Sequence, residues 1–133
     1  MNIENLVALT KKLRILVVED NQDSREQFVD MLQNLCDNIT SAVDGEDGLQ
    51  KFKENNFDLV ISDINMPKMN GIEMVSAIRE YDSKTAVIVV SAHNEENYLE
   101  EAQHLNINEY IYKPIDLGSF IESMSKIVTK MNE

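Results

Sequence analysis

The sequence predicts an α/β fold in which one doubly wound parallel sheet of five strands carries helices on both faces. Two observations lead to this prediction. Short apolar runs alternate with segments whose apolar residues recur every three or four positions, as in an amphipathic helix. The alternation repeats along the 133 residues, and consecutive βα units build a parallel sheet through right-handed crossovers. The length suits one domain with its own core.

Five segments are expected as strands. Three are largely apolar, as in strands that are buried on both faces, and they lie at residues 13–18, 57–62 and 85–90. Two are weaker or shorter, as at the edges of a sheet, and they lie at residues 38–43 and 109–112. With the three apolar strands at the centre, the expected order is 2-1-3-4-5, which is the flavodoxin-like arrangement.

Five helices are expected to follow the strands in turn. Asp23, three residues before Glu26, is the expected start of the first helix, and Asn70 with Glu73 is that of the third. Leu117 is expected on the inner face of the last helix. The expected helices cover residues 23–35, 44–55, 70–80, 94–105 and 116–130.

The first twelve residues stand outside this pattern. We therefore expect an N-terminal extension at residues 1–12 and the folded domain at residues 13–133. Ile3, Leu6 and Val7 could line a turn or two of helix, and a frayed tail is the alternative.

Charge and composition exclude several classes of function. Lysine and arginine number 12 against 24 acidic residues, a net charge of −12. Such a chain lacks a basic surface for nucleic acid, and anionic lipid should repel it. No apolar run approaches the ~20 residues of a membrane span. Cys36 is the single cysteine, so no internal disulfide can form, and a reducing, cytoplasmic location is expected.

Polar residues follow four of the five expected strands. Ligands of such sheets bind at the carboxyl ends of the strands, beside the switch in strand order. Five side chains are expected to meet at this edge: Glu19, Asp20, Asp63, Ser91 and Lys113. Each alone has an ordinary structural explanation, as a helix cap, a turn residue or a surface lysine. Their coincidence at one edge favours a functional site.

Three carboxylates in one place must be neutralised. One like-charge pair at 4 Å costs roughly 4 kcal/mol at an effective dielectric constant near 20. Either one carboxyl keeps a proton, with a raised pKa, or a cation binds. Oxygen ligands without cysteine or paired histidine favour Mg²⁺, with Mn²⁺ possible. With Lys113 and Ser91 nearby, the group resembles a cage for a phosphoryl group, in which an Asp63 oxygen would be the nucleophile.

Two other functions are compatible with the fold. A metal-dependent aspartyl-phosphate phosphohydrolase would need its nucleophile in an Asp-x-Asp pair after the first strand, where this chain has Glu19-Asp20. A flavin-binding electron carrier would need a loop rich in Gly, Ser and Thr there. Residues 20–23 are Asp-Asn-Gln-Asp instead, and they would repel a phosphate.

The motifs together resemble those of two-component response-regulator receiver domains. The resemblance covers nearly the whole chain from residue 13. It rests on Ile-Leu-Val-Val-Glu-Asp-Asn at 15–21, Asp-Ile-Asn-Met-Pro at 63–67, Asn-Gly at 70–71, Val-Val-Ser-Ala at 89–92 and Tyr-Ile-Tyr-Lys-Pro at 110–114.

The resemblance implies a role for each site residue. Asp63 would be the phosphoacceptor. Asp20 would bind Mg²⁺ directly and Glu19 through water, with Asp63 and the backbone carbonyl of Asn65 as further ligands. The phosphoryl oxygens would be bound by Ser91 and Lys113.

The resemblance also implies a switch. Lys113–Pro114 would be a cis peptide, and the Tyr110 ring would move inward when Ser91 is drawn to the phosphoryl group. Asn65 and His93 occupy positions that tune the phosphoryl lifetime in the family.

The implied function is signalling rather than metabolism. A histidine kinase or histidine phosphotransfer protein would donate the phosphoryl group, and the domain would assist its own phosphorylation and slow dephosphorylation. The output would be a downstream protein target, or an effector domain removed from the sequence.

Overall fold

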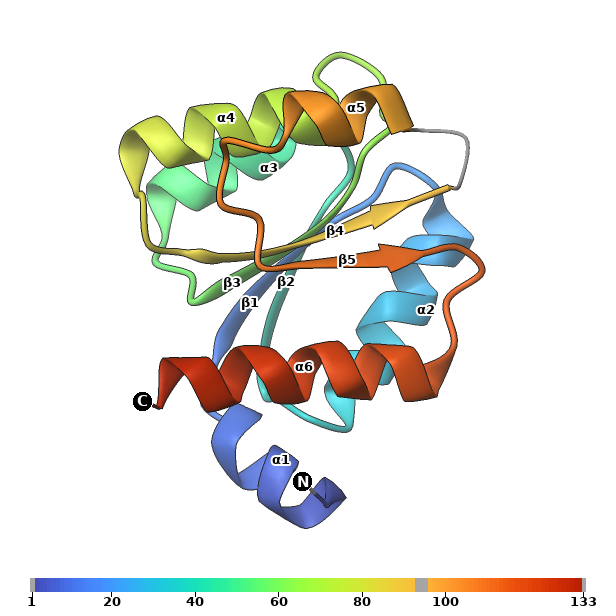
Figure 1. The fold of residues 1–133 in the computed structure, drawn as a ribbon, viewed down its shortest axis with the longest axis vertical. Helices are drawn as coiled ribbons and strands as arrows, with labels where there is room; N and C mark the ends of the chain where they lie inside the picture. The colour runs from blue at the N-terminus through green and yellow to red at the C-terminus, as the bar shows by residue number, and fades with distance from the viewer. Residues whose placement is uncertain (1, 93–95, 133) are drawn as a thin grey trace.

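Five strands form one parallel sheet in the computed structural model, which describes residues 2–92 and 96–132 (Figure 1). Their order is β2-β1-β3-β4-β5, with parallel register throughout. The strands are β1 (Arg14–Val18), β2 (Asn38–Ala42), β3 (Leu59–Asp63), β4 (Ala86–Ser91) and β5 (Glu109–Tyr112). The predicted flavodoxin-like arrangement is confirmed.

Helices cover both faces of the sheet (Figure 1). One face carries α1 (Ile3–Thr10), α2 (Gln22–Gln33) and α6 (Leu117–Met131). The other carries α3 (Gly45–Glu54), α4 (Gly71–Tyr81) and α5 (Glu96–Glu101). The five predicted helices of the βα units correspond to α2–α6. Asn94, the expected first residue of the fourth helix, lies outside the described residues.

The sheet separates two apolar cores. Ile15 and Val17 of β1 pack in the core beneath α1, α2 and α6, whereas Leu16 and Val18 pack in the core beneath α3, α4 and α5. Successive strand residues point to opposite faces, so a strand covered on both sides must be apolar at every position. This explains why β1, β3 and β4 are apolar over most of their length.

The N-terminal segment is helical and joins the first core. Leu6 is fully buried there, and the Thr10 hydroxyl donates a hydrogen bond to the Leu35 carbonyl at 2.6 Å. Of the two alternatives for residues 1–12, the helix is therefore present. The domain boundary at residue 13 stays a prediction.

Two expectations about the helices were wrong. The cap of α2 is Asn21, whose side chain accepts a hydrogen bond from the Ser24 amide, and Asp23 lies within the first turn. Asn21 is the last residue with extended backbone, so it can cap where Asp23 cannot. Leu117 is 56% exposed because it lies in the first turn of α6, before the buried stripe that begins at Phe120.

The start of α4 lies tightly against the end of β3. Asn70 and Glu73 form a capping box there, as predicted. The Gly71 amide donates to the Ile64 carbonyl at 2.7 Å, and a Cβ on Gly71 would lie only 2.1 Å from the Asp63 carbonyl oxygen. Only glycine permits this approach, which helps to fix the backbone that directly follows Asp63.

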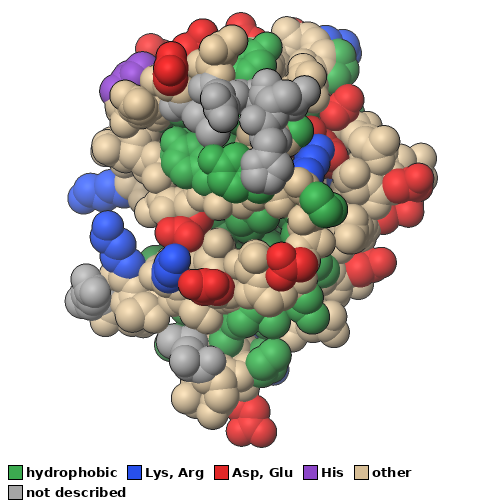
Figure 2. Space-filling view, turned by 45° about the vertical axis from the view of Figure 1, so that its right-hand side comes forward, with side chains coloured by type: hydrophobic (Ala, Val, Ile, Leu, Met, Phe, Trp, Pro, Cys, Tyr) green, Lys and Arg blue, Asp and Glu red, His purple; other side chains and the backbone are tan. Residues whose placement is uncertain are grey.

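The surface is rich in acidic side chains, which spread over the face in Figure 2 among few basic ones. Among the described residues, no helix combines the length and apolar character that crossing a membrane requires.

Candidate functional site

The end of β1 carries two carboxylates in different surroundings. Glu19 continues the strand, since its amide donates to the Ala42 carbonyl of β2 at 3.1 Å, and its side chain is 1% exposed. Asp20 follows it and is exposed. Asn21 then caps α2, so the turn between strand and helix is short. Glu19 is thus buried at the end of β1, whereas Asp20 faces solvent.

The end of β3 carries the third carboxylate. Asp63 is 6% exposed and adjoins β1 in the sheet. Its Oδ1 accepts a hydrogen bond from the Ile64 amide at 2.9 Å, and its Oδ2 accepts one from Lys113 Nζ at 3.2 Å. Both oxygens are therefore held in place by neighbouring donors.

The three carboxylates form one cluster. Glu19, Asp20 and Asp63 each present an oxygen within 4.8 Å of the other two. The crossover order brings this about, because β1 and β3 are neighbours although 43 residues separate Asp20 from Asp63. The sequence prediction that strand ends would bring these acids together agrees with the geometry.

The pKa of Glu19 reflects the burial and the negative charge of the cluster. Burial, followed by the adjacent Asp63 carboxylate, raises the pKa of its carboxyl to about 8, and the nearby Lys113 charge opposes this rise. Among the described residues, neither Glu19 oxygen has a hydrogen-bond partner. A buried carboxylate without hydrogen-bond donors is costly, which is the physical reason for the raised pKa.

These features suit a hard divalent cation. Mg²⁺ and Mn²⁺ prefer carboxylate, carbonyl and water oxygens, and the cluster offers oxygens from three carboxylates. A cation there would give the unpartnered oxygens of Glu19 a counter-charge, directly or through a water molecule. The donor set therefore fits magnesium. Asn65, expected to add its backbone carbonyl, is an exposed residue beyond the end of β3.

Lys113 supplies the positive charge of the site. It follows β5, and its Nζ lies 3.2 Å from Asp63 Oδ2 and 3.6 Å from Glu19 Oε1. Its amide donates to the Ser91 carbonyl at 2.9 Å, which continues the pairing of β4 with β5. The Lys113–Pro114 peptide bond is cis. The ammonium group thus bridges two of the three acids.

Ser91 and Tyr110 lie on the two strands beyond β3. Ser91 ends β4, one residue past Val90, the register partner of Asp63. It is fully buried, and its hydroxyl donates to the Ala92 carbonyl at 2.8 Å. Tyr110 pairs with Val89 in the sheet and packs, half-buried, against the core beneath α3, α4 and α5. Burial raises the pKa of its hydroxyl. His93 lies outside the described residues.

Arg25 is a site neighbour that the sequence did not reveal. Its Nη1 donates to the Glu19 carbonyl at 2.9 Å and lies 3.4 Å from the Asp20 carbonyl. One feature of the sequence could have pointed to Arg25. A basic residue five positions after the acid that follows a strand lies about one turn into the next helix. Without the turn geometry, nothing distinguished Arg25 from a solvated arginine.

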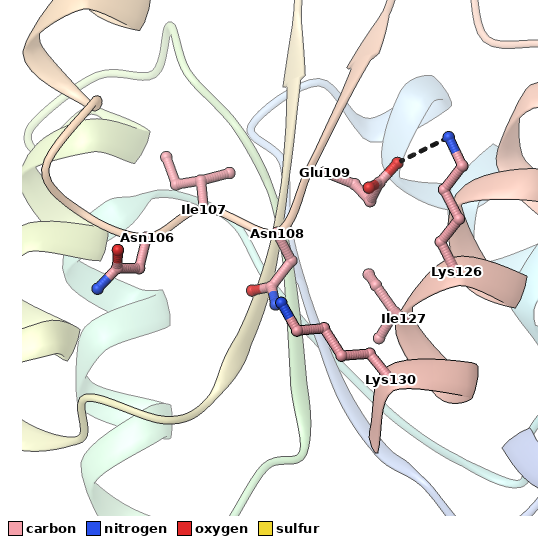
Figure 3. A pocket seen from close by; sticks show the side chains of 7 residues that line it. All are labelled: Asn106, Ile107, Asn108, Glu109, Lys126, Ile127 and Lys130. Atoms are coloured by element: carbon pink, nitrogen blue, oxygen red, sulfur yellow. Dashed lines mark ion pairs between the residues drawn. The ribbon is translucent and has the colours of Figure 1, made fainter. Parts of the chain in front are cut away.

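A hollow of about 410 Å³ lies elsewhere, between the start of β5 and the end of α6 (Figure 3). Lys126 and Lys130 reach into it, and Lys126 forms a 4.0 Å ion pair with Glu109. Glu109 begins β5, whereas Lys113 follows its end, so the hollow opens at the opposite edge of the sheet from the acids. We therefore place the candidate site at the carboxyl ends of the strands, because of the side chains that meet there and not because of the size of a cavity.

Known proteins resemble this chain over most of its length. A family model described as the response regulator receiver domain matches residues 15–125. The chemotaxis protein CheY of Treponema pallidum is 35% identical over 118 residues, which cover 86% of this chain and 82% of that protein.

Two solved structures share the fold. The N-terminal domain of an uncharacterized protein from Wolinella succinogenes is 35% identical with a TM-score of 0.83, covering 92% of this chain and 100% of that chain. A chain of the CheX–CheY–BeF₃–Mg²⁺ complex from Borrelia burgdorferi is 29% identical with a TM-score of 0.80. That match covers 88% of this chain and 90% of the other.

Proposed function

The chain belongs to the response regulator receiver domain family, and we propose that it is a phosphorylation-controlled switch whose acceptor is Asp63. The observation that carries the proposal is the position of this carboxylate. Asp63 lies in the acidic cluster with Lys113 beside its Oδ2, so an anion on that oxygen would meet a fixed positive charge.

The transfer itself is a substitution at phosphorus. A carboxylate oxygen of Asp63 attacks the phosphoryl group of a phosphohistidine on the donor protein. The new O–P bond forms as the P–N bond breaks, and the bonding electron pair stays on the imidazole. The chain's own part is to hold the Asp63 carboxylate in place, through the Ile64 amide on Oδ1, and to set Lys113 beside Oδ2 and the developing charge.

Glu19, Asp20, Asp63 and the Asn65 carbonyl would hold Mg²⁺, with Mn²⁺ as an alternative. When bound, the cation would neutralise the phosphoryl oxygens and the acids together. Its binding would favour the ionised form of Glu19, whose pKa is raised by burial and by Asp63 when no cation is present. The related CheX–CheY complex from Borrelia contains Mg²⁺ together with BeF₃, which supports this assignment.

The response would pass through Ser91 and Tyr110. A phosphoryl group on Asp63 would compete with the Ala92 carbonyl for the Ser91 hydroxyl, which is one strand away. Moving Ser91 inward would pull the chain that leads into α5 and open space for the Tyr110 ring. We propose α5, β5 and α6 as the regulated surface, with Asn65 and His93 tuning the phosphoryl lifetime.

The partners follow from this chemistry. The donor would be a histidine kinase or a histidine phosphotransfer protein, and the output would be a protein target or an attached effector domain. CheX in the related Borrelia complex is one protein seen with such a chain. The acidic surface argues against direct binding to nucleic acid or membranes, and we expect a cytoplasmic location.

A phosphohydrolase is less well supported. Its nucleophile would follow β1, but the residues there are an adjacent Glu19-Asp20 pair. Self-catalysed phosphorylation and slow dephosphorylation need no other active site.

Intact-mass measurement after incubation with acetyl phosphate and Mg²⁺ tests the acceptor. The wild type should gain one phosphoryl group. Asp63→Asn, which keeps the shape without the nucleophile, should gain none. Asp30→Asn, a change at an exposed acid of α2, is the matched control and should behave as wild type. Phosphorylation of Asp63→Asn at the wild-type rate would refute the assignment.

A further inference from the structure

Arg25 connects α2 to the backbone of the acidic cluster. The side chain is half-buried, and its Nη1 donates to the Glu19 carbonyl at 2.9 Å and lies 3.4 Å from the Asp20 carbonyl. The guanidinium therefore contacts the backbone of two acids rather than their carboxylates. It holds the peptide groups from which those side chains project.

The turn between β1 and α2 has three attachments. On the strand side, the Glu19 amide donates to the Ala42 carbonyl. On the helix side, the Asn21 side chain caps α2. Between them lies Asp20, whose side chain is exposed and whose peptide group has Arg25 beside it. Arg25 is thus placed to fix the direction of the Asp20 carboxylate, since a side chain's direction follows its backbone dihedral angles.

Charge alone would not favour this arrangement. A positive guanidinium beside a turn that holds a divalent cation repels that cation. A role in positioning and a role through charge therefore predict opposite effects of removing Arg25. Positioning predicts weaker cation binding, and charge predicts stronger binding.

We propose that Arg25 is a positioning residue for the cation site, holding the Glu19 and Asp20 peptide groups so that both carboxylates face Asp63. The proposal rests on the proposed function, because it assumes that this cluster binds Mg²⁺. Arg25 itself touches neither the cation nor the phosphoryl group.

Mg²⁺ titration by calorimetry tests the proposal, with four variants beside the wild type. Arg25→Met removes the donors and keeps most of the aliphatic chain. Arg25→Lys keeps the charge but replaces the rigid planar guanidinium, whose Nη1 contacts both carbonyls, by a flexible ammonium group. Lys53→Met removes the same charge from an exposed position on α3, and Asp20→Asn removes the proposed direct ligand.

Positioning predicts that Arg25→Met raises the Mg²⁺ Kd by about tenfold, within the range for removing a partner that orients a metal ligand. Arg25→Lys should lie between Arg25→Met and wild type, and Lys53→Met should match wild type. Melting in EDTA should show that both Arg25 variants remain folded. Thermal stability changed without a change in Kd would indicate a merely structural role.

Two results would overturn the proposal, and they are distinguishable. An unchanged or lower Kd in Arg25→Met, with binding lost in Asp20→Asn, would refute the role of Arg25 and leave the metal site intact. Wild-type binding in Asp20→Asn would refute the metal site itself, and with it the role that depends on it.

Discussion

At the scale of single residues, the main feature of the site is that three carboxyl groups meet in one place. Glu19 is buried without a hydrogen-bond partner in the described part of the chain and shares Lys113 with Asp63, and Asp20 faces solvent. The same three acids would be ordinary on an open surface. What distinguishes them is that their carboxylates meet at the carboxyl ends of β1 and β3, where Glu19 and Asp63 are buried, and this creates an electrostatic cost that a cation can relieve.

Glu19 should make the metal-free protein sensitive to pH. Its pKa rises from 4.5 to about 8 on folding, so the folded state binds the proton more tightly than the unfolded state does. This stability is present below the unfolded pKa and is lost as pH rises from about 5 to 8. In EDTA, the free energy of unfolding of wild type should fall across this window by at least about 2 kcal/mol relative to Glu19→Gln.

Denaturant unfolding at several pH values, on both proteins, measures this difference. Glu19→Gln is the internal reference, because every other titrating group is shared. Parallel stability curves for the two proteins would show that Glu19 titrates normally. With saturating Mg²⁺, the wild type should instead gain more stability than Glu19→Gln as pH rises, because ionised Glu19 favours the cation.

At the scale of elements, α1 is an integral part of the core. Leu6 packs with Leu32 and Phe120 in the core beneath α1, α2 and α6, and Thr10 binds the Leu35 carbonyl. Residues outside the βα pattern therefore cover apolar surface that would otherwise be exposed.

Leu6→Ala should lower the free energy of unfolding by about 2–4 kcal/mol, because it leaves a cavity at a fully buried position. Ile3→Ala, on the same helix but 55% exposed, should change it by less than about 0.5 kcal/mol. Chemical denaturation compares the two. Equal small effects would mean that α1 is not packed as described.

The periodicity of apolar residues predicted the strands and helices, and the residues at the ends of the strands predicted the site. The strand order followed from which strands are largely apolar, and the meeting of Glu19, Asp63 and Lys113 followed from the strand order. Details that depend on local backbone geometry were not predictable in this way. Asn21 rather than Asp23 caps α2, because capping depends on which residue is extended. Arg25 and the close approach at Gly71 required the turn geometry itself.

At the scale of the whole molecule, the proposed switch links the site to a distant surface. Ser91 ends β4 and Lys113 directly follows the adjacent strand β5, and the chain beyond Ser91 leads into α5. Arg79 of α4 donates to the carbonyls of Leu105 and Asn106, in the connection between the end of α5 at Glu101 and the start of β5 at Glu109. A movement of Ser91 would thus act on the start of α5, while the hydrogen bonds of Arg79 would hold the residues that follow α5 in place. Its extent is limited by the difference in phosphoryl affinity between the two states.

Backbone amide chemical shifts, recorded with and without beryllofluoride and Mg²⁺, test this central claim most directly. We predict that the amide shifts change around Asp63 and also at Ser91, along α5 and at Tyr110. The changes in this second set of residues should be smaller in Ser91→Ala. Changes confined to the neighbours of Asp63, with α5 and Tyr110 unaltered, would contradict the account.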